Sequence, residues 1–110
     1  MQGRATLRAT NAMSSRSAIE TALRHLAPRI PKHEFGAVVD HALDSAGLRA
    51  ASPETAAWLS LTAYVRHALT EYDDLLRQGY DQDSARFFVA GAMRETLAEW
   101  GVRRPLGAED

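Results

Sequence analysis

Apolar residues recur at intervals of three and four along most of the chain, which places them on one face of an α-helix. Strict alternation of apolar and polar residues, the strand pattern, occurs nowhere. Proline and glycine divide the periodic stretch into four predicted helices, over residues 18–27, 32–45, 53–78 and 81–100. Because short connections keep neighbouring helices in contact, the pattern predicts an all-α fold of four main helices in one compact, bundle-like domain.

Residues with helix-capping chemistry stand at the expected helix ends. Ser17 and Ser52 precede the first and third helices, where a hydroxyl oxygen can accept a hydrogen bond from a free backbone N–H. Asp81 stands in the same place before the fourth helix, where the helix dipole also favours negative charge. Gly47 and Gly79 are predicted to end the second and third helices, because glycine readily adopts the left-handed conformation found there.

Three large aromatic residues, Trp58, Phe88 and Trp100, fall on the apolar faces of the third and fourth predicted helices. Aromatic side chains bury large areas, so we expect all three in the hydrophobic core, with a dimer interface as the alternative. Ala92 belongs to the same expected inner face as Phe88.

The two ends of the chain lie outside the helical pattern. Residues 1–16 hold three arginines, no acid and, apart from Met1, only Leu7 and Met13 as large apolar side chains. Burying so little apolar surface does not offset an ordering cost of about 1–2 kcal/mol per residue. The sequence therefore predicts a disordered basic arm over residues 1–16, a helical domain over 17–104 and a flexible tail over 105–110. Deletion of residues 1–15 is expected to leave the fold intact.

Composition narrows the classes of protein. The chain has 110 residues, 45% of them hydrophobic and 25% charged, with a formal net charge of -1. A domain of this size can bury its own core, and the near-neutral charge argues against a strongly basic nucleic-acid binder. The absence of cysteine excludes disulfides, thiolate metal sites and a cysteine nucleophile. No apolar run approaches the roughly 20 residues that span a membrane, so we expect a cytoplasmic protein.

A polar stripe follows one side of the predicted helix 53–78 and holds the best candidates for chemistry. An imidazole beside two carboxylates can serve as a general acid or base, or begin a metal site. His67 and Glu71 supply only two ligands, whereas a catalytic zinc site needs three. The sequence therefore predicts no cofactor. The structural alternative, which we favour, has His67 hydrogen-bonded to Glu71 or to a neighbouring helix. The stripe consists of Ser60, Tyr64, His67, Glu71, Asp74 and Gln78.

The opposite flank of the same predicted helix carries Thr62, Arg66, Asp73 and Arg77. Asp73 and Arg77 stand four residues apart, a spacing that predicts an exposed ion pair worth about 0.3 kcal/mol. Arg66 could bind an anion through its guanidinium group. A solvated charged face is the simpler interpretation, and the sequence alone favours it.

Residues 68–94 have an approximate helix-turn-helix rhythm, with Gly79 in the turn. The second helix opens with Asp81 and Asp83, which would face DNA phosphates, and Arg86 and Arg94 are its only cations. So few cations provide little phosphate affinity, so we regard this motif as a packing unit.

Four stretches of the chain resemble a bacterial family catalogued as domain of unknown function 2293: HLAPRIPKHEFGAVVDHAL, SPETAAWLSLTAYVRHALTEYDDLL, GYDQDSARFFV and LAEWG. The resemblance runs from about His25 to Gly101. It implies the limits of the folded part and carries no activity with it. It directs attention to Arg66, His67, Thr70, Tyr72, Asp73 and Arg86, to which the polar stripe adds Glu71 and Asp74.

The sequence thus favours a small cytoplasmic interaction module that binds a protein partner or a second copy of itself, because no catalytic constellation is complete. Two alternatives stay open. One is a small enzyme or a metal- or ligand-binding protein that uses His67, Glu71 and Asp74. The other is a weak nucleic-acid binder that uses the basic arm or residues 68–94. No membrane partner is expected.

Overall fold

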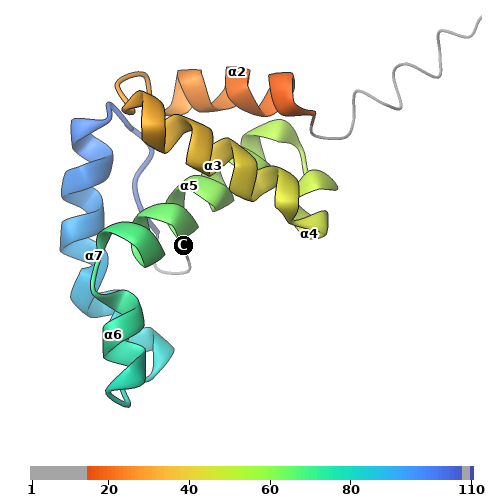
Figure 1. Cartoon of the computed structure of the whole chain (residues 1–110). Helices are drawn as coiled ribbons and strands as arrows, with labels where there is room; N and C mark the ends of the chain where they lie inside the picture. The colour runs from red at the N-terminus through yellow and green to blue at the C-terminus, as the bar shows by residue number, and fades with distance from the viewer. Residues whose placement is uncertain (1–14, 108–109) are drawn as a thin grey trace, which may run out of the picture.

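The computed structural model describes residues 15–107 and residue 110, and in this part every regular element is a helix (Figure 1). Four main helices are present, as predicted, together with two short ones. Most of the predicted basic arm, residues 1–14, lies outside the described part, and only its last two residues, 15 and 16, are described. The helices are α2 (Arg16–Leu26), α3 (Lys32–Asp44), α4 (Ala46–Arg49), α5 (Pro53–Leu69), α6 (Tyr72–Arg77) and α7 (Gln82–Glu99).

Helix α5 is the centre of the fold and contacts each of the other five helices. Figure 1 shows α2 and α3 lying across one side of α5, while α7 and the short α6 occupy the other end. Because α5 is surrounded, its apolar residues are buried on more than one side, and Trp58, Leu61 and Val65 form the middle of the core. Ile19 and Leu23 of α2 pack into the same cluster.

The caps of the third and fourth predicted helices are confirmed. The Ser52 hydroxyl accepts a hydrogen bond from the Thr55 N–H at 3.2 Å, and the Asp81 carboxylate accepts one from the Ser84 N–H at 2.8 Å. Each bond satisfies a backbone donor that has no partner within the helix.

Two predicted ends are wrong. Ser15, not Ser17, caps α2 by accepting a hydrogen bond from the Ala18 N–H. Arg16 therefore lies in the helix rather than in the arm. The predicted C-terminal end of the second helix is the other error. Helix α3 stops at Asp44 because the Ser45 hydroxyl caps the additional helix α4, and Gly47 lies inside α4 instead of ending α3.

The turn after α2 is fastened to the end of α7. The Arg29 N–H donates to the Trp100 carbonyl at 2.9 Å, and the Arg29 side chain donates to the carbonyls of Glu99 and Ala98. Gly101 makes this approach possible, since its φ is 84° and a Cβ there would lie 2.9 Å from Pro28 Cγ. A cation at the C-terminus of α7 also complements the helix dipole.

The predicted single helix over residues 53–78 is wrong, because the chain breaks between Leu69 and Tyr72 into α5 and α6. Thr70 is extended, with φ -135° and ψ 175°. Its hydroxyl donates to the Arg66 carbonyl at the end of α5 and accepts from the Tyr72 N–H at 3.1 Å at the start of α6. One side chain thus offers both helix ends an alternative to a continuous hydrogen-bond ladder.

The break moves α6 and the start of α7 away from the other helices, as the lower part of Figure 1 shows. Trp58 and Trp100 are buried as predicted. The core prediction for Phe88 is wrong, since it is 56% exposed, and Ala92 is exposed as well. Among the helices described, only α5 and α6 pack against α7, so neither residue is covered by a neighbouring helix.

No helix in residues 15–107 combines the length and the apolar character that crossing a membrane requires.

Candidate functional site

The eight candidate residues gather around the break between α5 and α6 and on the facing part of α7. The structure separates them into two groups that share Tyr72. One group faces the interior and contains Arg66, Tyr72 and Arg86. The other group faces solvent and contains His67, Glu71, Asp73 and Asp74. Thr70 lies between the two groups, at the break between α5 and α6.

The solvent-facing group is a short chain of contacts. His67 Nδ1 lies 2.7 Å from Asp73 Oδ1, and the His67 ring meets Tyr72 edge-on with 5.2 Å between centroids. Of the two partners expected for His67, Glu71 is wrong and a neighbouring helix is confirmed, because the break places Asp73 on α6 and turns it toward the imidazole. The predicted pair of Asp73 with Arg77 is also wrong, since Arg77 pairs with Asp74.

This group does not form the metal site that the polar stripe suggested. The side chains of His67 and Asp73 are 52% and 46% exposed, so water screens their interaction. Within the described residues, no three histidine or acidic side chains cluster closely enough to hold a metal ion. Ser60, another member of the stripe, is buried and donates a hydrogen bond to the Val38 carbonyl of α3.

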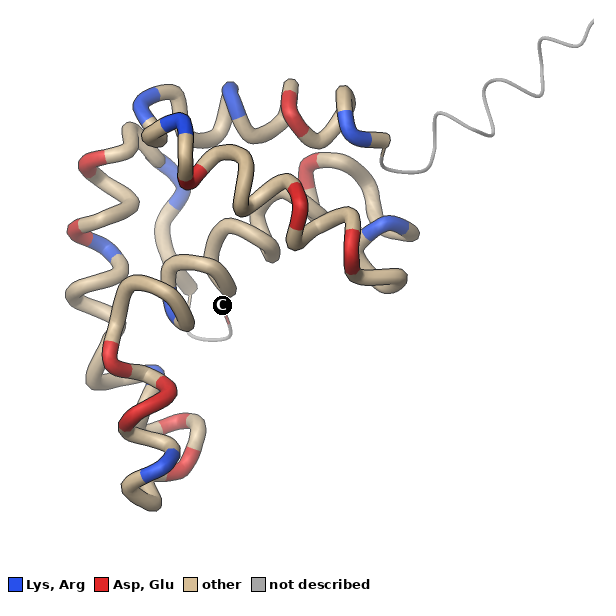
Figure 2. The backbone as a smooth tube through the Cα atoms, viewed as in Figure 1, with Lys and Arg blue, Asp and Glu red and all other residues tan. Residues whose placement is uncertain are grey.

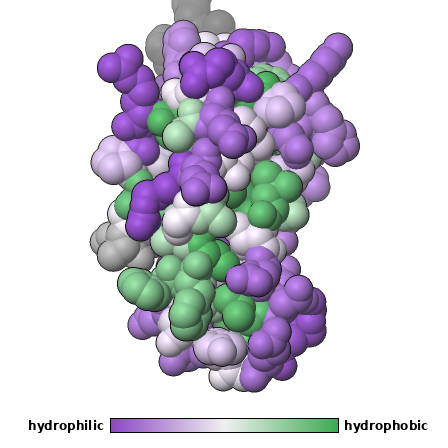
Figure 3. Space-filling model, turned by 90° about the vertical axis from the view of Figure 1, so that its left-hand side faces the viewer, coloured by the Kyte–Doolittle hydropathy of each residue, from purple (hydrophilic) through white to green (hydrophobic). Residues whose placement is uncertain are grey.

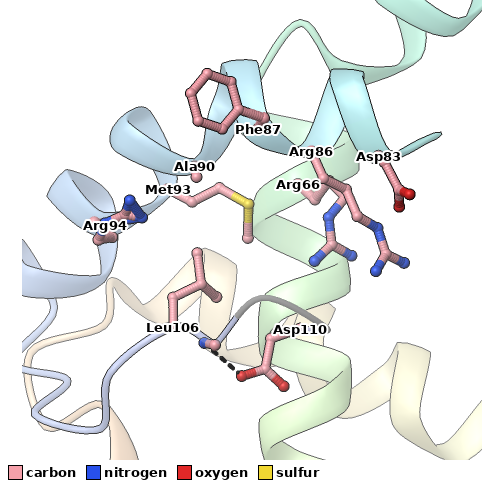
Figure 4. Close-up of a pocket in the computed structure, with 10 residues that line it drawn as sticks. Arg66, Asp83, Arg86, Phe87, Ala90, Met93, Arg94, Leu106 and Asp110 are labelled. Carbon is pink, nitrogen blue, oxygen red and sulfur yellow. Dashed lines mark hydrogen bonds between the residues drawn. The ribbon is translucent and has the colours of Figure 1, made fainter. Parts of the chain in front are cut away.

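The interior group opens into a pocket of about 540 Å³ between α5, α7 and the end of the chain (Figure 4). The guanidinium groups of Arg66 and Arg86 extend into it side by side, the first from α5 and the second from α7. Met93, Ala90 and Leu106 supply an apolar surface beside these cations. The lining is completed by Asp83, Phe87, Arg94, Gly107 and Asp110.

Arg66 is the unusual member of the pocket. It is only 6% exposed, and its guanidinium carbon lies 5.7 Å from the centre of the Tyr72 ring. Its Nε is buried without a hydrogen-bond partner, and no carboxylate of the described residues forms an ion pair with it. The interpretation of Arg66 as part of a solvated face is therefore wrong.

The charge state of Arg66 reflects this setting. Burial lowers the pKa of Arg66 below its ordinary value, and the positive charge of Arg86 lowers it further. Tyr72 and Asp110 act in the opposite direction and only partly offset these effects. The guanidinium group nevertheless stays protonated near neutral pH, so the pocket holds two neighbouring positive charges.

Asp110 forms the wall opposite the two arginines. Its carboxylate accepts hydrogen bonds from the Trp58 Nε1–H at 3.1 Å and from the Gly107 N–H at 2.8 Å. Burial acts to raise the pKa of Asp110, but these hydrogen bonds and the charges of Arg104 and Arg66 outweigh it, so the pKa lies below its usual value. Arg104 also lies 4.2 Å over the Trp58 ring. Within the segment expected as a flexible tail, residues 105–110, Asp110 therefore makes defined contacts.

The arrangement suits the binding of an anion. A guanidinium group offers five N–H donors in a planar fork that matches the oxygens of carboxylate and phosphate groups. Burial strengthens such contacts because little water competes. Sequence reasoning singled out Arg66 and Arg86 but missed Arg94, Leu106 and Asp110, since no periodic pattern or motif connects these residues to the site.

Fold and site together define a small all-α protein with an arginine-lined pocket beside its central helix. The chain belongs to the family described as uncharacterized conserved protein (DUF2293), whose model matches residues 22–101. The matched region contains Arg66, Tyr72 and Arg86, whereas Leu106 and Asp110 follow it. The chain has no match among curated proteins or among solved structures.

Proposed function

We propose that this protein is a small interaction module that binds one anionic group of a partner protein, a carboxylate or a phosphoryl group, in the pocket between α5 and α7. The anion accepts hydrogen bonds from Arg66 and Arg86, while Met93 and Leu106 contact the apolar part of the residue that carries it. A cytoplasmic location, expected from the sequence, stays a prediction.

One observation supports this proposal above all others. Arg66 is buried beside another cation, and its Nε has no hydrogen-bond partner. Removing an ion from water carries a penalty of several kcal/mol unless opposite charge compensates it. An anionic ligand would supply that charge and accept the unused hydrogen bond.

Charge distribution favours a protein partner over a nucleic acid. Acidic residues dominate α6 and the start of α7, next to the pocket, as the lower part of Figure 2 shows. They include Asp73, Asp74, Asp81 and Asp83. A nucleic acid presents a phosphate at every nucleotide, so a strand crossing this region would meet repulsion. A single anionic side chain can enter the pocket without that penalty.

Isothermal titration calorimetry tests the proposal with three probes: inorganic phosphate, a phosphotyrosine-containing peptide and an aspartate-rich peptide. We expect at least one peptide to bind and Arg66→Gln to weaken that binding at least about tenfold, equivalent to about 1.4 kcal/mol. Arg77→Gln is the matched control, because Arg77 is an exposed arginine whose ion pair lies outside the pocket.

Three outcomes would contradict the proposal. The first is the absence of heat with all three probes at millimolar concentration. The second is an equal loss of binding in the Arg66→Gln and Arg77→Gln variants, which would indicate non-specific attraction. The third is tighter binding of a single-stranded oligonucleotide than of either peptide, which would favour the nucleic-acid alternative.

A further inference from the structure

The outer face of α7 presents an aromatic surface that no described segment of the chain covers. Phe87 is 79% exposed and Phe88 is 56% exposed, and their ring centroids lie 6.1 Å apart. Figure 3 views the molecule from the α7 side and shows a continuous apolar area in the lower part of that face. Adjoining exposed aromatic residues on a small protein mark a surface that binds another macromolecule.

Gly91 lies on the same face of α7, one turn after Phe87. Glycine destabilises a helix interior relative to alanine, so its presence calls for a packing reason. Nothing lies within 4 Å of the position that a Cβ of Gly91 would occupy, so no contact among the described residues requires a glycine there. The missing side chain leaves a shallow gap into which a ring from outside can fit.

Charged residues flank this aromatic surface in a self-complementary order. Asp83, Phe87, Gly91 and Arg94 follow one another at spacings of four, four and three, which aligns them along one side of the helix. The acid stands at one end of the line and the base at the other. When two such helices run antiparallel, each acid meets a base.

We propose that two copies of this chain pair through the outer faces of their α7 helices, antiparallel about a twofold axis that passes between Phe88 and Val89. In this register Asp83 stands opposite Arg94 of the partner subunit, and the symmetry repeats the pair. Phe87 stands opposite Ala90 of the partner subunit and packs into the gap beside Gly91. The small residues allow the two helix backbones to approach closely.

The charge order selects a second copy rather than an unrelated partner. A twofold interface brings the same surface patch together with itself, so each patch must complement its own reverse. The line from Asp83 to Arg94 meets that requirement. The pairing surface borders the anion site, since Asp83, Phe87 and Arg94 also line the pocket, whereas Arg66 and Arg86 point into it (Figure 4). Light scattering measures pairing and calorimetry measures anion binding, so the two proposals can fail separately.

Charge reversal tests the pairing in the full chain. Size-exclusion chromatography with light scattering is expected to give a dimer that dissociates on dilution. Asp83→Arg and Arg94→Asp each place like charges together and are expected to raise the dissociation constant at least about tenfold. The double variant restores the opposite charges in reverse order and is expected to return it to near the wild-type value. Arg77→Asp, on α6, is the charge-matched control.

A variant of Gly91 separates pairing from folding. Leucine is a strong helix former and the position is open, so Gly91→Leu is expected to retain its helix content by circular dichroism and to become monomeric. A wild-type chain that stays monomeric up to millimolar concentration would overturn the proposal. So would an unchanged dissociation constant in Asp83→Arg, a Gly91→Leu variant that stays dimeric, or a double charge variant whose dissociation constant does not return toward the wild-type value.

Discussion

Arg66 is a buried cation that forms no ion pair with a carboxylate of the described residues, and Asp110 offsets its unfavourable setting only in part. The face of the Tyr72 ring attracts it, but Arg86 repels it and burial opposes its charge. Charged groups in protein interiors are ordinarily paired, because an isolated charge loses its hydration without compensation. A buried charged group with a perturbed pKa and no ion-pair partner is typical of a binding site.

A first prediction follows from this conflict between stability and binding. Arg66→Met keeps an apolar stem of similar length and removes the charge, so we expect the free energy of unfolding to stay constant or to rise by about 1–4 kcal/mol. Urea denaturation measures this change, and calorimetry is expected to show that anion binding is lost. Arg77→Met is the control for the loss of one positive charge.

A large loss of stability in Arg66→Met, above about 2 kcal/mol, would contradict this account. It would show that the guanidinium group holds α5, α6 and α7 together, as buried arginine stems can do through packing.

At the scale of the element, the break between α5 and α6 is the feature with the largest effect on the site. It turns Tyr72 inward, where the ring contacts both Arg66 and His67. A continuous helix would place Arg66 and His67 on different flanks with no side chain to connect them. The break therefore assembles the site, and Thr70 stabilises the break.

The second prediction concerns this threonine. Thr70→Val keeps the shape of the side chain but removes both hydrogen bonds of its hydroxyl, so we expect a loss of about 1 kcal/mol in the free energy of unfolding. Thr21→Val is a matched control, because Thr21 is an exposed threonine on α2. Equal stability of the two variants would show that the break does not depend on the Thr70 hydroxyl.

The sequence predicted the four main helices because Ser52 and Asp81 have strong capping chemistry and the apolar periodicity is regular. It did not predict the break, because Tyr72, Leu75 and Leu76 of α6 continue the inward-facing pattern of α5 almost without interruption. Periodicity reports which residues face inward and cannot distinguish one long helix from two that share a core. The pocket was not predictable for a related reason, since Arg66 and Arg86 come together only through the packing of α7 on α5.

At the scale of the whole molecule, α5 is fastened to α3 by two hydrogen bonds across the core. Ser60 donates to the Val38 carbonyl at 2.7 Å, and the Tyr64 hydroxyl donates to the Glu34 carboxylate. The hydrogen bond to Glu34, followed by burial and by the negative charge of Glu34, raises the pKa of Tyr64 to about 12.

The third prediction is the pH dependence that this link confers. The pKa of tyrosine is about 10 in an unfolded chain, so the fold favours the protonated phenol. The resulting stability is fully present below about pH 10 and is lost as the pH rises through about 12. We expect Tyr64→Phe to unfold more easily than wild type by about 1–2 kcal/mol near neutral pH, with the difference shrinking above about pH 10.

Urea denaturation at several pH values measures this difference. Tyr80→Phe is the control, because the Tyr80 side chain is exposed on the turn before α7. A difference between wild type and Tyr64→Phe that stays constant across the alkaline range would contradict the assignment.

The contacts of Trp58 connect its fluorescence to the wall of the pocket. The indole N–H of Trp58 donates to Asp110, and the Arg104 guanidinium group covers its ring. Indole fluorescence responds to local polarity and to charged groups nearby, so an anion that displaces Asp110 by repulsion or attracts Arg104 changes the emission of Trp58. The chain holds only two tryptophans, and the other, Trp100, lies at the far end of α7. The protein therefore carries its own optical reporter of pocket occupancy, and its ligands can be sought in solution without any attached label.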